Sequence, residues 1–272
     1  MMVERQAKSG LGLITDQSSP VHAWSAPIAS GVAALHFSAA PHRRGPNQDC
    51  AAVVGVDERR AVILVADGLG GHAGGAEASR VLAESIEAQV AAGYASLHEA
   101  VVNGVVTANE ALIALGIGSG TTLGLVTVDG DTVRPYHVGD TTILVLGRRG
   151  RVRMRTVDHS PTAEAHAAGE ISDDEALHHH QRHIVDNVIG APEMHLEVGK
   201  PMKLNARDTV LIASDGLHDN LYPSEIIERT RRPDIDEALT SLRDLARERM
   251  DAPYADAPSK PDDLTIALFR LG

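Results

Sequence analysis

Five aspartates in this sequence share one setting, because each lies at an end of an apolar stretch and beside a turn. They are Asp49, Asp67, Asp140, Asp215 and Asp262. A carboxylate in that position can point out of the end of a sheet while its backbone is held rigidly. The glycines that follow Asp67 and Asp215 allow unusual φ angles and a close approach to an ion. A single Asp-Gly pair is more often only a turn, but like charges brought together need cations.

The ligand type indicates which ions these would be. Oxygen ligands alone suit the hard cations Mg²⁺ and Mn²⁺ and do not suit zinc. Two such ions, about 3.5–4 Å apart, bridge one water, lower its pKa and hold a phosphoryl group in line for displacement. The aspartates therefore predict a two-metal hydrolase centre at one end of a sheet.

Short apolar strands joined by tight turns must position these carboxylates. Two continuous apolar runs, 61–66 and 209–214, each lead into an Asp-Gly pair. Further strands are expected over 121–128, 132–138, 141–146, 152–156 and 264–271. Turn residues at 129–131 and 147–150 predict hairpins, which favour antiparallel pairing over parallel crossovers.

Helical periodicity is equally clear over 77–92, 97–115 and 235–250. Two of these segments follow the first strands and one precedes the last strand. The order predicts an α+β domain in which antiparallel sheets pack on each other or on helices. Residues 1–30 show no periodicity, so we expect an irregular N-terminal arm, with at most a short strand at its end, before one domain over 31–272.

Composition excludes several classes of protein. The chain has 272 residues with 25 basic and 37 acidic ones, a net charge of −12 that repels nucleic acid and anionic lipid. Aromatic residues are 3%, which disfavours stacking of bases or sugars. No apolar run approaches the roughly 18 residues of a membrane span, and we find no signal peptide. The single cysteine allows no intrachain disulfide and favours the cytoplasm.

The aspartates stand in a series of motifs that resembles the metal-dependent protein phosphatase family, PP2C, and especially its bacterial serine/threonine phosphatases. In chain order the motifs are Arg44-Gly-Pro-Asn-Gln-Asp49, Asp67-Gly-Leu-Gly-Gly-His72, Gly120-Thr-Thr122, Gly139-Asp-Thr141, Ser214-Asp-Gly216 and Asp262-Asp-Leu-Thr265. They cover nearly the whole chain after the arm. The resemblance implies two antiparallel sheets sandwiched between pairs of helices. It also implies hydrolysis of phosphoserine and phosphothreonine in proteins.

The resemblance implies ligands for two Mn²⁺ or Mg²⁺ ions. Asp67 would bridge both ions, and the Gly68 carbonyl would bind the second. Asp215 and Asp262 would complete the shell of the first ion, while Asp49 would act mainly through a bound water. A hydroxide that bridges the ions would attack phosphorus directly, without a phosphoenzyme.

Three further assignments follow from the same resemblance. Asp140 would help to hold a third, weaker ion. Arg44 would clamp the substrate phosphate in a bidentate fork. Residues 158–192 match the flap of the bacterial phosphatases, and this flap would place Ser160 near the substrate. The phosphorylated partner would be a target of a serine/threonine kinase, and we expect a monomer.

Gln48 departs from the family pattern, because this position often carries glutamate. A neutral amide is a weaker metal ligand, so the second ion would rely more on the Gly68 carbonyl and on waters. The departure leaves open a pseudophosphatase that keeps the fold as a phosphoprotein-binding module. The presence of Asp67, Asp215 and Asp262 favours the enzyme instead. A two-metal nuclease is disfavoured by the acidic surface.

Several other residues have simpler interpretations. His72 could donate a proton to the leaving group but more often orders its own loop, and His178–His180 suggest an exposed loop more than a metal patch. Cys50 is expected in the core. We expect Asp263 to accept hydrogen bonds in its turn, and Asp219 to be an ordinary turn residue.

Overall fold

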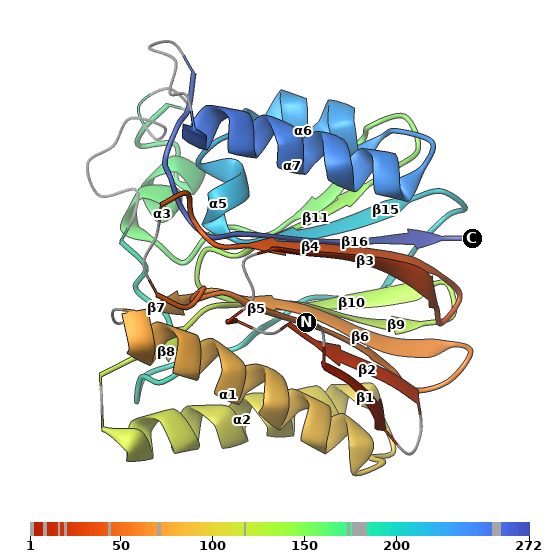
Figure 1. Ribbon diagram of the computed structural model, residues 1–272, viewed down its shortest axis with the longest axis vertical. Helices are drawn as coiled ribbons and strands as arrows, with labels where there is room; N and C mark the ends of the chain where they lie inside the picture. The colour runs from red at the N-terminus through yellow and green to blue at the C-terminus, as the bar shows by residue number, and fades with distance from the viewer. Residues whose placement is uncertain are drawn as a thin grey trace.

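The computed structural model of the chain describes residues 3–7, 10–15, 17–18, 21–42, 45–69, 72–116, 118–172, 175, 184–251 and 257–272. Two antiparallel sheets lie face to face, and helices cover the outer face of each (Figure 1). One helical layer contains α1 (His72–Ala91) and α2 (Leu97–Leu115), and the other contains α6 (Pro223–Thr230) and α7 (Ile235–Asp251). The predicted α+β sandwich between pairs of helices is confirmed.

The larger sheet has eight strands in the order β1-β2-β5-β6-β9-β10-β13, and β14 also pairs with β10. Their bounds are β1 (Val3–Ala7), β2 (Gly10–Ile14), β5 (Cys50–Gly55), β6 (Arg60–Ala66), β9 (Leu123–Asp129), β10 (Thr132–Val138), β13 (Glu197–Val198) and β14 (Met202–Lys203). The hairpin turn between β9 and β10 contains Gly130 at a φ of 60°, a conformation that glycine adopts without strain.

The smaller sheet has six strands in the order β12-β11-β15-β16-β4-β3. Their bounds are β12 (Val152–Arg155), β11 (Thr142–Leu146), β15 (Thr209–Ala213), β16 (Leu264–Leu271), β4 (Gly31–Ser38) and β3 (Val21–Ile28). A separate short pair joins β7 (Gly68–Leu69) to β8 (Gly120–Thr121). Every strand pairing is antiparallel, as the turn chemistry predicts.

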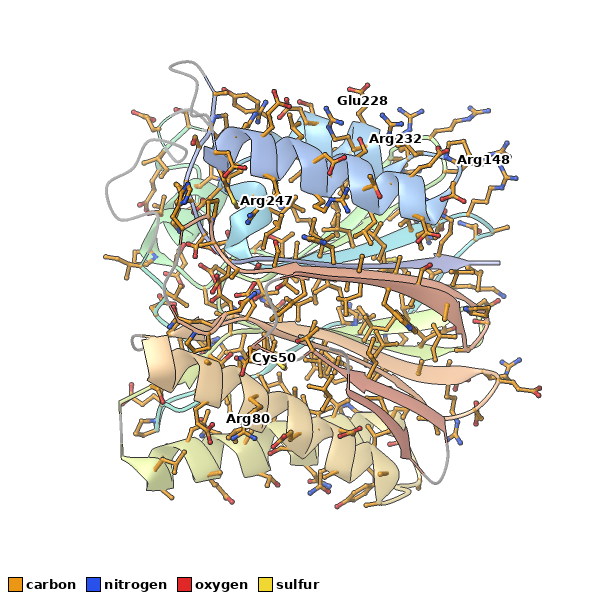
Figure 2. The ribbon with its side chains drawn as sticks, viewed as in Figure 1. Cys50, Arg80, Arg148, Glu228, Arg232 and Arg247 are labelled. Atoms are coloured by element: carbon orange, nitrogen blue, oxygen red, sulfur yellow. The ribbon has the colours of Figure 1, made fainter. Side chains whose placement is uncertain are left out.

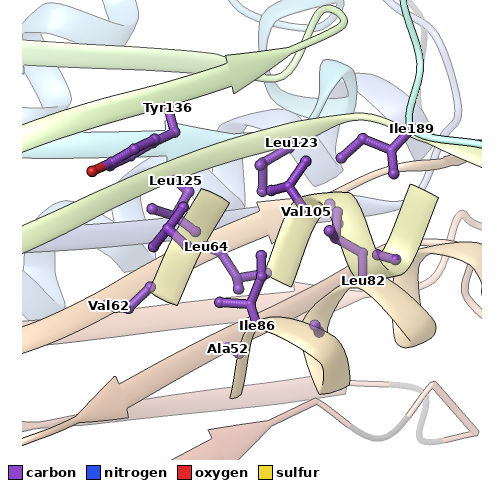
Figure 3. Close-up of a cluster of buried hydrophobic side chains, with 14 of the residues drawn as sticks. Ala52, Val62, Leu64, Leu82, Ile86, Val105, Leu123, Leu125, Tyr136 and Ile189 are labelled. Atoms are coloured by element: carbon purple, nitrogen blue, oxygen red, sulfur yellow. The ribbon is translucent and has the colours of Figure 1, made fainter. Parts of the chain in front are cut away.

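The core explains why β6 is a continuous apolar run. Val62 and Leu64 point into the cluster beneath α1 and α2, which Figure 3 shows, while Ile63 and Val65 point into the cluster between the sheets. Both faces of the strand are thus buried, and neither face keeps polar residues. A third cluster fills the space between the smaller sheet and α6 and α7. All three clusters are mainly aliphatic, in keeping with the scarcity of aromatic residues.

The N-terminal segment differs from the sequence-based expectation. We predict an irregular arm over residues 1–30, but β1, β2 and β3 all lie there. β3 forms a hairpin with β4 and is an edge strand, where Pro27 is tolerated because an edge strand need not donate every N–H. Glycines and prolines hide the period-2 pattern in this segment. Pairing of β2 with β5 and of β3 with β4 stabilises these strands, although their local sequence only weakly favours strand structure.

None of the helices in the described ranges is long and apolar enough to cross a membrane. The predicted helices over 97–115 and 235–250 match α2 and α7 within one residue, whereas α1 begins at His72, five residues earlier than expected. Within the predicted flap over 158–192, the structure places the short helix α3 (Pro161–Ala167).

Candidate active site and metal centre

The five predicted aspartates lie where strands of both sheets begin or end. Asp67 directly follows β6 and Asp140 lies two residues after β10, while Asp49 directly precedes β5 in the same sheet. From the smaller sheet, Asp215 begins the short helix α5 (Asp215–His218) just after β15, and Asp262 lies two residues before β16. Antiparallel pairing brings these termini to one end of the sandwich.

The electrostatics of Asp67 show that these carboxylates gather. Burial is the largest cause that raises the pKa of Asp67 well above its usual value. Four negative charges raise it further, those of Asp49, Asp215, Asp140 and Asp262. All four other predicted aspartates therefore lie close enough to repel Asp67. The predicted constellation comes together in space, although its members are spread over more than 200 residues of sequence.

Asp67 is held by the residues of the Gly120-Thr-Thr122 motif. The Asp67 backbone N–H donates to Thr122 Oγ1 at 3.0 Å, and Thr121 Oγ1 donates to the Asp67 carbonyl at 2.9 Å. Thr122 N–H also donates to the Asp67 carbonyl at 2.9 Å. Both threonines are buried. The motif thus fixes the backbone of the central aspartate and leaves its carboxylate for other partners.

Asp49 joins the two sheets at the site. Its Oδ2 accepts hydrogen bonds from Ser214 Oγ at 2.8 Å and from Thr265 Oγ1 at 2.6 Å, both in the smaller sheet's motifs. The side chain is almost fully buried, with 1% exposure. Burial, followed by the negative charge of Asp263, raises its pKa well above the usual value, and the two hydroxyl donors oppose that shift. A buried carboxylate of this kind calls for a cation nearby.

Asp140 also belongs to the cluster, because its charge raises the pKa of Asp67. Burial, and then the charge of Asp215, raises the pKa of its carboxyl to about 7, while His218 acts in the opposite direction. Asp158 in the flap is also close to His218, and burial raises its pKa as well. One oxygen of Asp158, Oδ1, is buried without a hydrogen-bond partner. Asp158 thus belongs to this acidic surface, although the sequence marks it only as part of the flap.

Lys260 is a member of the site that the sequence does not indicate. Its ammonium lies 2.6 Å from Asp215 Oδ2, 2.8 Å from Asp219 Oδ2 and 3.2 Å from Asp262 Oδ2. Asp219 is therefore more than a turn residue, because it shares this cation with two predicted metal ligands. The spacing of four residues between Asp215 and Asp219, the C-cap residue of α5, is the signal that would have identified Asp219.

Asp263 connects the site to the loop before β5. Its Oδ1 accepts the Ala40 N–H at 2.7 Å and its Oδ2 accepts the Gln48 N–H at 2.8 Å. The predicted role as a hydrogen-bond acceptor is confirmed, but the partners lie across the molecule and not in its own turn. The segment between Ala40 and Gln48 is thus anchored at both ends by one buried carboxylate.

Gly68 and Gln48 lie together beside the beginning of α1. A Cβ on Gly68 would lie 2.1 Å from the Gly75 carbonyl oxygen, so only glycine allows this contact. A Cβ on Gly75 would in turn lie 2.5 Å from Gln48 Nε2. The Gln48 side chain therefore reaches the same region as the Gly68 backbone, where the second ion is expected.

The remaining sequence-predicted residues have the following positions. Ser160 is 4% exposed and caps α3, because its Oγ accepts the Ala163 N–H at 3.1 Å. This bond uses the hydroxyl as an acceptor only, and the assignment of Ser160 to substrate binding stays a prediction. Cys50 is in the core as expected, and burial raises its thiol pKa to about 12. Arg44, the His72 side chain and His178–His180 lie outside the residues that the structure describes.

A second group of ligand-type side chains, His137, His159 and Glu197, lies on β10, the flap and β13. His159 Nδ1 faces two donors, Gly139 N at 3.1 Å and Asn187 Nδ2 at 2.7 Å. Its proton must then be on Nε2, directed at Glu197 Oε2 at 3.3 Å. Because a metal at Nε2 would have to displace that proton, we interpret His159 and Glu197 as a hydrogen-bonded pair. Both ring nitrogens of His137 are buried without a hydrogen-bond partner among the described residues.

Comparisons with known proteins agree with this geometry. A model of the protein phosphatase 2C family matches residues 39–250. The serine/threonine phosphatase stp of Listeria monocytogenes is 30% identical over 242 residues, which cover 84% of this chain and 91% of that protein. The structure of the S. agalactiae serine/threonine phosphatase has a TM-score of 0.76 and 26% identity, covering 92% of this chain and 100% of that one.

A further solved structure is similar in fold. The catalytic domain of the phosphatase PstP, in complex with two manganese ions, has a TM-score of 0.69 and 24% identity, and the match covers 88% of this chain and 96% of that one.

Two face-to-face sheets that gather five carboxylates at one end define a metal-dependent phosphoester hydrolase. More specifically, the chain belongs to the protein phosphatase 2C family. It is a serine/threonine protein phosphatase, and its cofactor is Mn²⁺ or Mg²⁺. None of the comparisons supports the pseudophosphatase alternative.

Proposed function

We propose that the aspartate cluster at the end of the sandwich is the catalytic metal centre of this phosphatase. The observation that carries the proposal is the raised pKa of Asp67, caused by burial and by four neighbouring carboxylates. A protein would not gather these charges without cations to offset them. The donor set consists of oxygen atoms alone, which fits Mn²⁺ and Mg²⁺.

The proposed ligands divide between two ions. Asp67 would hold both, Asp215 and Asp262 would complete the first, and the Gly68 carbonyl would bind the second. Asp49 would contribute through a water. The bonds from Ser214 and Thr265 engage its Oδ2, which leaves Oδ1 for that water.

Two residues at the edges of the centre have weaker proposed roles. Gln48 would align a water beside the second ion, since its amide lies next to Gly75 and Gly68. Asp140 would help to hold a third ion, because its pKa of about 7 leaves it only partly ionised near neutrality without a cation. Bound ions would supply an activated water and offset the charge of the phosphoryl oxygens.

Arg44 is proposed to bind the substrate phosphate. The support is its position four residues before Gln48, in a segment that Asp263 fastens at Ala40 and Gln48. A guanidinium donates two parallel N–H bonds to a phosphate, which a lysine cannot do. This residue would orient the phosphoryl group against the centre and exclude one solvent molecule from it.

We propose that the substrates are phosphorylated proteins, the targets of a serine/threonine kinase. The related phosphatases supply the chemical class, and the acidic surface disfavours nucleic acid. A cytoplasmic location is proposed because the single, buried cysteine leaves no intrachain disulfide to form. We further propose a monomer as the working unit.

The direct test is phosphate release from a phosphothreonine peptide with Mn²⁺, with Mg²⁺ and with a chelator. We expect turnover that requires either ion and is absent with the chelator. Binding of the phosphopeptide without turnover under all three conditions would establish the pseudophosphatase instead. Cleavage of a DNA oligonucleotide in place of the peptide would indicate a nuclease.

A further inference from the structure

The end of the sandwich opposite the aspartates carries a concentration of arginines. Six of them are Arg148, Arg149, Arg151, Arg207, Arg231 and Arg232, which we call the arginine face. They come from the β11–β12 hairpin, the loop before β15 and the turn between α6 and α7. Figure 2 shows Arg148 and Arg232 away from α5, toward the end where the C-terminus lies in Figure 1. This face is strongly positive on a protein whose net charge is −12.

Two hollows run across the arginine face. The larger, of about 660 Å³, lies between the β11–β12 hairpin and residues 202–208. The smaller, of about 190 Å³, lies between the same hairpin and the turn after α6. Gly147 and Arg148 line both hollows, so the hollows adjoin at the hairpin, and we call the two together the groove. Asp208 is the single acidic residue among the residues that line it.

Within the part of the chain that the structure describes, none of the six arginines forms an ion pair. Asp208 is already occupied, because it is buried and pairs with Arg153 beneath the groove. Arg270 is likewise committed to Thr209 Oγ1 and to the carbonyls of Pro233 and Thr230. Arg153 and Arg270 are thus engaged within the protein, while the six arginines of the arginine face are available to bind a ligand.

The scaffold under the face is built from close contacts. Gly150 turns the hairpin at a φ of 80°, and a Cβ there would lie 2.6 Å from Arg231 Cδ. The hairpin therefore packs directly on the end of α6. Arg153 ties β12 to β14 through the Lys203 carbonyl at 2.8 Å. These contacts bring three segments, distant in sequence, together into one surface.

The side chains of the arginine face favour an acidic protein segment over nucleic acid as the ligand. Guanidinium groups bind carboxylates in bidentate pairs. No aromatic side chain lines the groove, so nucleic-acid bases would find nothing to stack on. β12 forms one edge of its sheet, and its Val152 is 43% exposed beside the groove. An extended peptide can pair with such an edge while its side chains meet the arginines.

We propose that the arginine face docks an Asp/Glu-rich segment of the phosphoprotein substrate. This inference rests on the proposed function, because it concerns how substrates of the catalytic centre are selected. Carboxylates are favoured over phosphates as the docking groups, since a phosphatase would remove a docking signal made of phosphate. Carboxylates survive the reaction and would retain a substrate through successive dephosphorylations.

The dimensions of the fold set the spacing of such a substrate. The eight residues of β16 connect the two ends, which corresponds to about 26 Å at roughly 3.3 Å per residue. An extended substrate chain therefore needs at least about eight residues between its phosphoresidue and its acidic segment. A flexible linker of about twelve residues would let one peptide occupy the catalytic centre and the arginine face at the same time.

The test compares two phosphothreonine peptides, one alone and one followed by a twelve-residue Gly/Ser linker and six glutamates. With the wild-type enzyme we expect the tail to lower KM by about tenfold at low salt and by less at high salt, with similar kcat. The double variant Arg148→Glu/Arg149→Glu should lose this advantage and hydrolyse the untailed peptide normally. The control Arg243→Glu, on α7 and paired with Asp244, should keep the advantage.

Direct binding separates this inference from the proposed function. Fluorescence anisotropy of the unphosphorylated acidic tail reports docking even if no peptide is hydrolysed. The proposal is overturned if the tail does not lower KM, if Arg243→Glu loses the advantage as fully as the double variant, or if an oligonucleotide or an anionic vesicle binds the face and the tail does not. Turnover of the untailed peptide in those cases would leave the proposed function intact.

Discussion

The two ends of the sandwich carry opposite charges on the same strands. β15 and β16 lie between Asp215 and Asp262 at one end and Arg207 and Arg270 at the other. The acidic end is buried and crowded, so its charges repel one another and raise the pKa values. The arginine face is exposed, so water screens its charges. The buried carboxylates therefore need bound cations to offset their repulsion. The solvated arginines are stable without a partner and are available to bind one.

The largest effect is expected where the acidic end depends on one carboxylate. Asp67→Asn should remove nearly all turnover, because both ions lose a shared anionic ligand. Asp129→Asn, at the last residue of β9, is the matched control and should keep normal activity. Phosphate release from a phosphothreonine peptide measures both. If Asp67→Asn retains more than about a tenth of the wild-type kcat, the dinuclear assignment is wrong.

Lys260 tests whether an internal cation takes part in neutralising the acidic end. Lys260→Met should bind Mn²⁺ more tightly, on the order of tenfold, because a positive charge no longer lies against Asp215 and Asp262. The metal-free variant should also melt at a lower temperature than the wild type, since three carboxylates lose their partner. Calorimetric titration and thermal melting with a chelator measure the two effects. Unchanged metal affinity would place the ions away from Lys260.

Gln48 tests the other side of the centre. Gln48→Glu adds a negative charge near Gly68 and should lower the metal concentration for half-maximal activity by about 3–30-fold, for an added attraction of about 1–2 kcal/mol. The effect on kcat at saturating metal should be smaller. Activity and calorimetry over a range of Mn²⁺ concentrations provide the measurement. Identical titrations of variant and wild type would mean that residue 48 does not face the ions.

The smallest expected effect is a pH dependence of stability confined to the acidic end. The folded-state pKa of Asp140 is raised to about 7 from 3.8, so the folded protein binds more protons than the unfolded chain between these values. The metal-free protein should thus lose stability as pH rises from about 4 to 7, with a Tm change on the order of 5 °C. Asp140→Asn should weaken this dependence without removing it, because the buried carboxyls of Asp49 and Asp67 also have raised pKa values. Melting curves that rise with pH in a chelator would contradict it.

Much of the fold and of the catalytic end could be predicted from the sequence, for a physical reason. Buried strands such as β6 need apolar side chains on both faces, and an aspartate after such a strand is conspicuous. Strand and helix boundaries in these segments differ from the prediction by few residues. The N-terminal strands were not predictable in the same way, because β3 is an edge strand that contains Pro27 and owes its form to β4.

The remaining features depend on which loops contact one another in the folded protein. The hydrophobic periodicity of the sequence gives no information about these contacts. Lys260 lies on an irregular segment, and its three carboxylate partners become visible only when α5 packs beside β16. Ser160 is a serine in a family motif, yet its environment makes it a helix cap. The arginine face combines residues from three loops that are separated by tens of residues in the sequence. No local sequence pattern therefore predicts it.

The hydrogen bonds of Asp49 and Asp263 have a consequence for the mechanics of the domain. Asp49 precedes a strand of one sheet and accepts bonds from the other, and Asp263 holds the backbone of the loop that leads into Asp49. The two sheets therefore cannot slide past each other without breaking the site. The same residues therefore support ion binding and hold the two sheets in position relative to each other. Loss of metal should then accelerate hydrogen exchange at the amides of both sheets together.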